Sequence, residues 1–293
     1  MPDTSVYRSY AKINLFLDVL DRRPDGYHNI ETIFQTVTLS DSLAFARQEH
    51  GIELTCSVPE LPTGGDNLVC RAAQLLLELA GVREGARIRL DKEIPVAAGL
   101  AGGSGNAAAA LVALNELWGL GLGEDELLGM GARLGADVPY CIVGGTVAAT
   151  GRGDELTPLP PAPPAWFVLL HPPISVSTAS VYNSPALAHN LETPVDGRTP
   201  TFQRALDALR AGDWARVVFN RMESAVFPGH PELAKGKQRL VDAGCVAAAM
   251  SGSGPTLFGV CEDEGQAREV AAAFRDMRVS VVQANPAGVT RLD

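Results

Sequence analysis

Apolar and polar residues alternate along several stretches of the first half of the chain, a pattern typical of β-strands. β-Branched residues are frequent in the same stretches, and strands favour such side chains because they pack well on a pleated surface. The pattern predicts two long strands followed by two shorter ones, over 6–19, 30–39, 52–58 and 87–90.

Two other stretches of this half repeat apolar residues at the spacing of a helix. The first covers 68–80, and either Asp66 or Asn67 is suited to cap it. The second covers 104–117 and is crowded with alanine, the residue with the highest helix propensity. We therefore expect strands first and then helices in this part of the chain.

The second half mixes shorter elements. One strand is predicted at 166–171, two short helices at 202–220 with a break near Gly212, and another helix at 231–243. The last stretch gives strand, strand, helix and strand over 246–250, 256–261, 264–275 and 279–284. This order is typical of an α+β layer with helices on one face of a sheet.

A proline cluster divides the two halves. Residues 158–164 lie in the run TPLPPAPPAW, and proline resists both helices and inner strands. We place a domain boundary here, which gives an N-terminal domain over 1–160 and a C-terminal domain over 161–293. The alternative is an ordinary loop within one domain.

Composition narrows the possible functions. The 293 residues carry a formal charge of −10 and only four lysines, so no basic block is available to bind nucleic acid. Five cysteines without a C-x-x-C pair suggest neither disulfides nor a zinc site. No stretch resembles a secretion signal or a membrane span, so we expect a cytoplasmic protein without a membrane partner.

The most informative segment is rich in glycine and leads straight into the predicted alanine-rich helix. Gly99, Gly102, Gly103 and Gly105 leave the backbone N–H groups with little side-chain cover, and Ser104 adds a hydroxyl. Exposed N–H groups at a helix start attract phosphate. The spacing matches neither a Walker A loop nor a dinucleotide fingerprint, so we predict a phosphate site of another type. Close helix packing is the structural alternative.

Four segments together resemble the GHMP kinase superfamily. They are AKINLFLDVLDRRPDGYHNIETIFQ (11–35), IPVAAGLAGGSGNAAAAL (94–111), LGADVP (134–139) and MSGSGPTLFG (250–259). The resemblance implies an α+β fold of two domains, the first like domain 2 of ribosomal protein S5 and the second ferredoxin-like. It also implies an ATP- and Mg²⁺-dependent kinase acting on a small molecule, as a monomer or weak homodimer.

The AKINL and DGYH sequences in the first segment point to one branch of the superfamily. By resemblance, its members phosphorylate the 2-hydroxyl of a cytidylyl-linked methylerythritol in non-mevalonate isoprenoid synthesis. Two alternatives stay open here. One is a kinase for another small alcohol, such as homoserine, mevalonate or a sugar, and the other is a nucleotide-binding sensor without turnover.

The resemblance assigns roles residue by residue. Asp137 is the base for the acceptor hydroxyl, and Lys12 pairs with it. The structural alternatives are a helix cap for Asp137 and a solvent-exposed strand position for Lys12. The implied ATP-binding residues are Asn67, Pro95, Ala97, Ala98, Gly99, Leu100, Ala101, Gly102, Gly103, Ser104, Gly105, Asn106, Ser251 and Gly252, with Ser104 also the candidate Mg²⁺ ligand.

The acceptor substrate is assigned to a separate set of residues. Asn14 lies on the same strand face as Lys12, Thr178 contacts the diphosphate, and the cytosine is surrounded by Tyr27, His28, Phe34 and Tyr182; Asp137 belongs to this set as well. The alternative for Phe34 and Tyr182 is that they are ordinary core residues without a role in substrate binding.

Three positions depart from the usual second motif of the superfamily, G-L-G-G-G-S-S-D-A-A. Ala101 replaces a glycine, Gly105 a serine and Asn106 an acid. Each departure changes the predicted phosphate site, by adding a methyl group, removing a hydroxyl and removing a charge.

Overall fold

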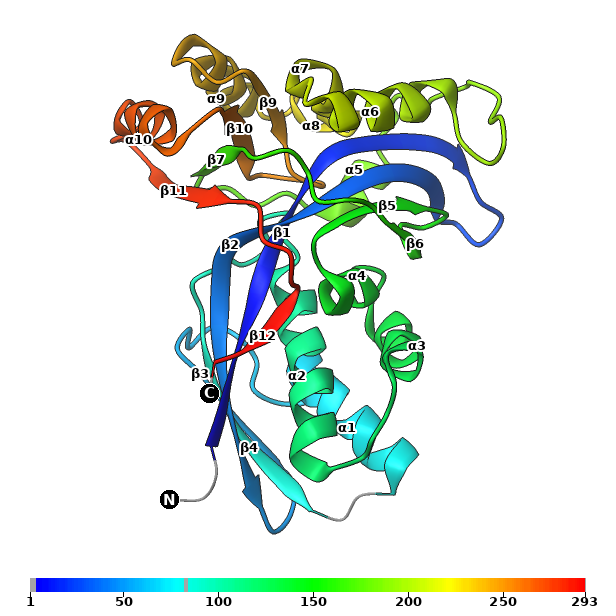
Figure 1. Cartoon of the computed structure of the whole chain (residues 1–293), viewed down its shortest axis with the longest axis vertical. Coiled ribbons are helices and arrows are strands. Elements are labelled where there is room, and N and C mark those ends of the chain that lie inside the picture. The colour runs from blue at the N-terminus through cyan, green and yellow to red at the C-terminus, as the bar shows by residue number, and fades with distance from the viewer. Residues whose placement is uncertain (1–3, 82–83, 293) are drawn as a thin grey trace.

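Two β-sheets organise the computed structural model, which describes residues 4–81 and 84–292 (Figure 1). The eight-stranded sheet has the order β12–β1–β2–β4–β3, with β5 beside β2 and β6, and β8 beside β1. Its strands are β1 (Thr4–Arg22), β2 (His28–Gln48), β3 (Ile52–Cys56), β4 (Gly85–Asp91), β5 (Thr146–Thr150), β6 (Glu155–Pro158), β8 (Phe219–Asn220) and β12 (Val289–Arg291).

The hairpin of β1 and β2 runs through almost the whole molecule. Its antiparallel register shifts between Tyr10 and Ala11, between Asn14 and Phe16, and between Val19 and Arg22. Such irregularities bend and twist a strand pair, and Figure 1 shows both strands curving below α6. One hairpin therefore contributes side chains to both halves of the fold.

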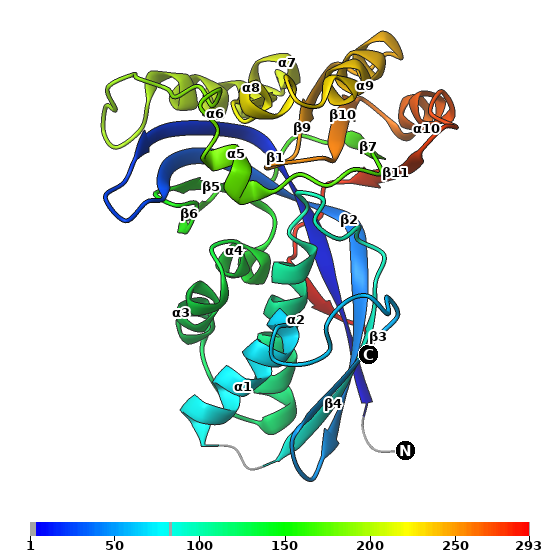
Figure 2. The same cartoon turned by 180° about the vertical axis from the view of Figure 1, so that it is seen from behind.

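Four helices cover one face of the larger sheet below this bend (Figures 1 and 2). They are α1 (Leu68–Ala80), α2 (Gly102–Trp118), α3 (Glu124–Leu134) and α4 (Val138–Val143). Small buried alanines on α2 let it pack closely against the neighbouring elements, within a core that also holds Tyr7 and Phe45. Asn67 caps α1 by accepting a hydrogen bond from the Val69 N–H at 2.9 Å.

The four-stranded sheet is antiparallel and has the order β11–β7–β10–β9. Helices α9 and α10 pack against it, while α6 and α7 pack beside the bent ends of β1 and β2. These elements are β7 (Trp166–His171), β9 (Ala247–Met250), β10 (Leu257–Cys261), β11 (Arg278–Gln283), α5 (Thr178–Tyr182), α6 (Pro200–Ala211), α7 (Trp214–Val217), α8 (Glu223–Val226), α9 (Pro231–Asp242) and α10 (Glu264–Ala272). No helix in the described ranges is long and apolar enough to cross a lipid bilayer.

The α+β expectation is confirmed, and the structure differs from it at the ends of several elements and in additional, mostly short elements. Both strands of the long hairpin extend beyond their predicted limits, and α10 ends at Ala272 rather than at residue 275. Elements α3, α4, α5, α8, β5, β6, β8 and β12 were not predicted, and most of them are short. The boundary at 160/161 stays a prediction. Strands β8 and β12 come from the second half of the chain and pair with β1 in the first sheet.

Candidate active site

A cavity of about 1050 Å³ is lined by residues from both halves of the chain. Its walls come from β1, β2, the segment before α2, the starts of α2 and α4, helix α5, and the turn between β9 and β10. In Figure 2, α5 and the tips of β9 and β10 lie close to the N-terminal end of α2. Segments distant in sequence therefore meet around one space.

The glycine-rich segment forms one wall. Three of its residues, Ala97, Gly99 and Ala101, have positive φ angles of 51°, 75° and 54°. Helix α2 begins immediately afterwards at Gly102, two residues before the predicted start, and Gly103 and Ser104 also line the cavity. The first N–H groups of a helix have no partner within the helix, so this wall is suited to bind an anion.

The turn between β9 and β10 packs directly on this segment. Ser251 donates its hydroxyl hydrogen to the Gly99 carbonyl at 2.9 Å, and a Cβ atom at Gly99 would collide with the Ser251 carbonyl. Gly252 then lines the cavity beside them. The close approach explains why glycine is required at position 99, which also has a positive φ angle.

Lys12 and Asp137 meet inside the cavity. Their charged groups are 3.8 Å apart, and Lys12 is only 5% exposed, so the alternative of a solvent-exposed lysine is wrong. Lys12 also donates to the Asn14 side chain at 2.7 Å and lies 5.0 Å from the centre of the Phe34 ring. Asp137 occupies the N-cap position of α4, but its side chain makes no capping hydrogen bond. Its carboxylate therefore faces the lysine rather than the helix.

Aromatic side chains gather at another part of the cavity. The His28 ring stacks on Tyr182, with centroids 5.2 Å apart, and also on His189 at 5.4 Å. Burial lowers the pKa of His28 and raises that of Tyr182, which favours neutral forms of both side chains. Tyr27 is 59% exposed and lies 5.3 Å from the Arg152 guanidinium. These rings provide flat surfaces and a neutral hydrogen-bonding group.

Comparison with known proteins identifies the family. Residues 67–145 match the family model "GHMP kinases N terminal domain" and residues 195–279 match "GHMP kinases C terminal". The chain is 47% identical to the 4-diphosphocytidyl-2-C-methyl-D-erythritol kinase of Pelotomaculum thermopropionicum, over 90% of this chain and 92% of the relative. It is 45% identical to the kinase of the same name from Moorella thermoacetica, over 94% and 96%.

The chain belongs to this family of GHMP kinases.

Solved structures agree with this assignment. A crystal structure of a 4-(cytidine 5'-diphospho)-2C-methyl-D-erythritol kinase aligns with a TM-score of 0.82 and 36% identity, over 96% of this chain and 99% of the other. A homoserine kinase from Cytophaga hutchinsonii aligns with a TM-score of 0.78 and 21% identity, over 100% and 98%. The second likeness shows the fold alone. Both confirm the expected two-domain GHMP kinase architecture.

A buried polar network adjoins the glycine-rich wall of the cavity. Lys92 forms an ion pair with Asp41, and the Asn106 amide donates to Asp41 and to Ser9, each at 2.8 Å. An acid at position 106 would bring a second negative charge against Asp41, which is fully buried. The asparagine that departs from the superfamily motif therefore fits its surroundings here.

The other two departures have local explanations. A Cβ atom at Gly105 would lie 3.3 Å from the Tyr10 carbonyl oxygen, so the helix packs tightly against β1 at this point. Ala101 remains at the cavity wall with its positive φ angle, a conformation that L-residues adopt at a cost.

Most of the predicted site residues line the cavity. Exceptions are Leu100, Gly105 and Ser251, which are buried behind its wall. Leu100 instead accepts a hydrogen bond from the Lys12 N–H at 3.1 Å through its carbonyl group. Asn67 both caps α1 and lines the cavity, so its two sequence-based interpretations are compatible.

Sequence reasoning missed several lining residues, among them Arg22, Lys92, Arg152 and Ser253. Lys92 lies two residues before the second matched segment and is one of only four lysines, and these two features could have marked it as a candidate. Arg22 and Ser253 lie within the matched segments 11–35 and 250–259, so these motifs could have indicated them, whereas Arg152 lies outside every matched segment. All three reach the cavity only through the fold.

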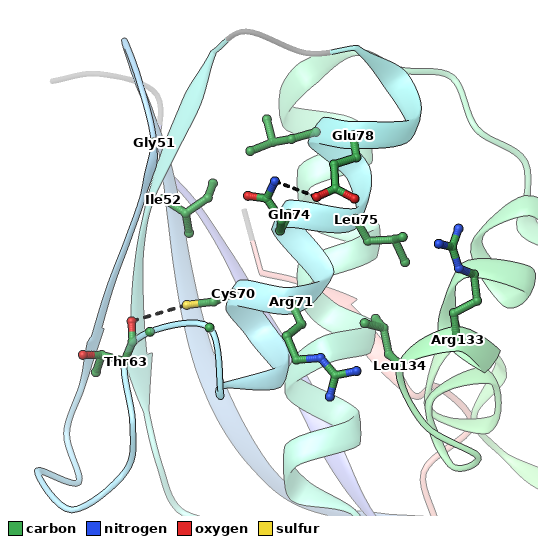
Figure 3. Close-up of a pocket in the computed structure, with 13 residues that line it drawn as sticks. Gly51, Ile52, Thr63, Cys70, Arg71, Gln74, Leu75, Glu78, Arg133 and Leu134 are labelled. Atoms are coloured by element: carbon green, nitrogen blue, oxygen red, sulfur yellow. Dashed lines mark hydrogen bonds between the residues drawn. The ribbon is translucent and has the colours of Figure 1, made fainter.

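A second cavity, of about 530 Å³, lies beside α1 and holds none of the predicted site residues (Figure 3). Its walls include Ile52, Thr63, Cys70, Arg71 and Arg133. The Cys70 thiol donates to the Thr63 carbonyl at 3.4 Å. Of these two cavities, the first therefore holds all the predicted site residues that line either one.

Proposed function

We propose that the protein transfers the γ-phosphoryl group of ATP to the 2-hydroxyl of 4-diphosphocytidyl-2-C-methyl-D-erythritol, giving the 2-phosphate and ADP in isoprenoid precursor synthesis. The observation that carries this proposal is the Lys12–Asp137 pair, 3.8 Å apart in a cavity with a phosphate-binding wall and an aromatic end. Relatives with the corresponding name, at 45–47% identity, support the choice of substrate.

Asp137 is the proposed general base. Its carboxylate accepts the proton of the 2-hydroxyl as that oxygen attacks the γ-phosphorus, and the bond from this phosphorus to the β–γ bridging oxygen breaks, releasing ADP. Lys12 orients the carboxylate and offsets the negative charge on the transferred group. Asn14, which accepts a hydrogen bond from Lys12, keeps the ammonium group in place.

The wall formed by 95–106 is the proposed site for the triphosphate of ATP. Backbone N–H groups at Gly102, Gly103 and Ser104 supply donors without any need for a lysine that follows the glycines. Gly252, on the opposing turn, approaches from the second half of the chain. Lys92 adds a positive charge at the same wall, although it is already paired with Asp41.

The aromatic end is the proposed site for cytosine. Tyr27 and Tyr182 supply flat surfaces, and a neutral His28 offers one donor or acceptor to the mixed polar edge of the base. Phe34 is 2% exposed and packs 4.5 Å from Tyr140, so it supports Lys12 from the core as well as lining the cavity. Thr178 lies at the start of α5, suited to contact the diphosphate.

Magnesium is proposed to arrive with ATP. The described residues contain no group of three or more His, Cys, Asp or Glu side chains that would hold a metal ion by themselves. We therefore propose that the ion is held chiefly by phosphate oxygens and water, with the Ser104 hydroxyl in the cavity wall as the protein ligand. When bound, Mg²⁺ neutralises phosphate charge.

Oligomeric state and cellular location stay predictions.

Turnover of the cytidylyl substrate tests the proposal. The purified protein is incubated with this compound and Mg·ATP, and ADP release is followed together with the mass of the product. We expect stoichiometric ADP and a singly phosphorylated product. Homoserine and mevalonate serve as competing acceptors. Absence of ADP above background, or faster turnover of a competitor, contradicts the proposed substrate.

A further inference from the structure

The His28 ring is held between structural neighbours and has two different nitrogen environments. Its Nδ1 atom is buried without a hydrogen-bond partner, whereas Nε2 is neither enclosed nor hydrogen bonded within the described residues. His28 is 6% exposed and lines the cavity. Nε2 is therefore the ring nitrogen available to a ligand, provided that the ring keeps its orientation.

Two aromatic rings hold the plane of this imidazole. Tyr182 and His189 lie nearly parallel to His28, at interplanar angles of 19° and 23°. They make no ring contact with each other within the described chain, so they meet His28 at different places. Tilting the imidazole out of this plane would weaken both stacks, each of which adds modest stability.

His189 stands on a backbone that is anchored on both sides. The preceding Ala188 donates its N–H to the Ser224 hydroxyl at 3.0 Å. The following Asn190 donates its N–H to the Val19 carbonyl at 2.7 Å and its side-chain amide to Asp18 at 2.9 Å. A loop residue held by hydrogen bonds to β1 and to the start of α8 can keep another ring in a fixed position.

We propose that His189 is a positioning residue for pyrimidine binding: it holds the His28 ring so that Nε2 faces the base of the cytidylyl substrate. This inference rests on the proposed function, because it assumes a pyrimidine at the aromatic end. His189 itself does not line the cavity, and it acts through His28. Its contribution comes from a flat ring, so an aromatic replacement retains it.

Three variants separate this role from others. His189→Ala removes the ring, His189→Phe keeps a ring that cannot be protonated, and Leu191→Ala is the matched control in the same segment, where Leu191 is 91% exposed. We expect His189→Ala to raise the KM for the cytidylyl substrate about three- to ten-fold, the range of one lost aromatic contact. The kcat and the KM for ATP stay within two-fold, and the other two variants resemble the parent protein.

Calorimetric titration with cytidine 5'-diphosphate gives an independent readout. The dissociation constant rises by the same factor in His189→Ala and is unchanged in His189→Phe and Leu191→Ala. Equal affinity for cytidine 5'-diphosphate in all four proteins overturns the inference. So does a loss of affinity in His189→Phe that equals the loss in His189→Ala. A rise in the KM for ATP, or no binding of the nucleotide to the parent protein, also overturns it. If the parent protein binds this nucleotide with the expected differences but does not turn over the substrate, the proposed function fails and the positioning role stands.

Discussion

The two ends of the active-site cavity are built in different ways. The phosphate wall comes from one continuous segment, 95–106, and presents mainly backbone atoms. The aromatic end combines Tyr27 from the β1–β2 connection and His28 from the start of β2 with Tyr182 from α5, and it presents side chains. Local sequence supplies most of the first end, which the turn between β9 and β10 then supports, whereas the second exists only after distant segments have packed together.

This difference affects how each end responds to substitution. A backbone site depends on φ angles and close packing, so most side-chain changes there act through conformation. A side-chain site loses a contact directly when one ring is removed. Lys12 and Asp137 lie where the two ends meet, and they are expected to affect turnover rather than binding at either end.

The largest expected effect is that of Asp137→Asn. Loss of the proposed base lowers kcat by about 10²- to 10⁴-fold, because general-base catalysis contributes on that scale. The dissociation constants for ATP and for cytidine 5'-diphosphate stay within two-fold, since neither end of the cavity is altered. Stopped-assay kinetics and calorimetry measure the two quantities. Asp125→Asn, on the exposed first turn of α3, is the control, and unchanged turnover in Asp137→Asn would show that the base is another group.

Tyr27→Ala is expected to have the next largest effect, limited to the aromatic end. Loss of a stacking surface raises the KM for the cytidylyl substrate about 5- to 150-fold, from roughly 1–3 kcal/mol per stacked base. The KM for ATP changes less than two-fold. Tyr27→Phe retains the ring and serves as the control. Initial-rate kinetics with each substrate varied in turn decide the matter, and equal increases in both KM values would refute a role in base binding.

A lower pH is expected to reduce the free energy of unfolding through two buried histidines, His171 in the core and His28 in the site. Burial lowers the pKa of His171 to about 4, and the unfolded chain therefore takes up a proton first as the pH falls below about 6.5. The free energy of unfolding falls by about 1–2 kcal/mol between pH 7 and pH 5 on this account. Urea unfolding at pH 7 and at pH 5 measures this change in the free energy of unfolding.

The variant His171→Gln reduces this pH dependence and leaves both KM values unchanged. His28 also has a lowered pKa, so His28→Gln reduces the dependence too, but it raises the KM for the cytidylyl substrate. If the two variants had the same kinetics, the assignment of His28 to the aromatic end would be wrong.

The smallest expected effect belongs to the phosphate wall. Ala101 has a φ angle of 54°, and glycine relieves roughly 1–2 kcal/mol of strain there while it loses about 0.5–1 kcal/mol through the entropy of the unfolded chain. We expect Ala101→Gly to raise the Tm by about 1–2 °C with little change in kinetics. Differential scanning calorimetry measures this shift. Ala108→Gly, in the buried interior of α2, lowers the Tm and is the control; a lower Tm in Ala101→Gly would contradict the strain argument.

Much of the fold followed from local patterns. Apolar patterns located the two long strands, α1 and α2, because long runs of these elements are buried in the core. The short strands β8 and β12 could not be predicted, since a strand of two or three residues forms only when β1 is already beside it. Strand β12 comes from the end of the chain and pairs with its beginning.

The candidate site was predicted unevenly for the same reason. Motifs identified the glycine-rich wall and, by resemblance, Lys12 and Asp137. No motif indicated His189, because its contact with His28 joins a loop after α5 to the first residue of β2. Arg152 escaped notice in the same way, since its position over Tyr27 depends on how the β5–β6 hairpin lies against the β1–β2 connection.

The sequence by itself indicated where backbone N–H groups with little side-chain cover would lie, since glycines followed by an alanine-rich helix favour them. The conformation of this wall also depends on tertiary packing, because Ala97 and Ala101 hold positive φ angles and Ser251 donates a hydrogen bond to the Gly99 carbonyl. The sequence also determined which residue types were available for proton transfer and stacking.

Only the tertiary structure decided that Lys12 lies 3.8 Å from Asp137 and that the His28 ring stacks on both Tyr182 and His189. Such contacts depend on the bent hairpin and on the junction of the two sheets, and no local preference specifies the distance between residues so far apart in the chain.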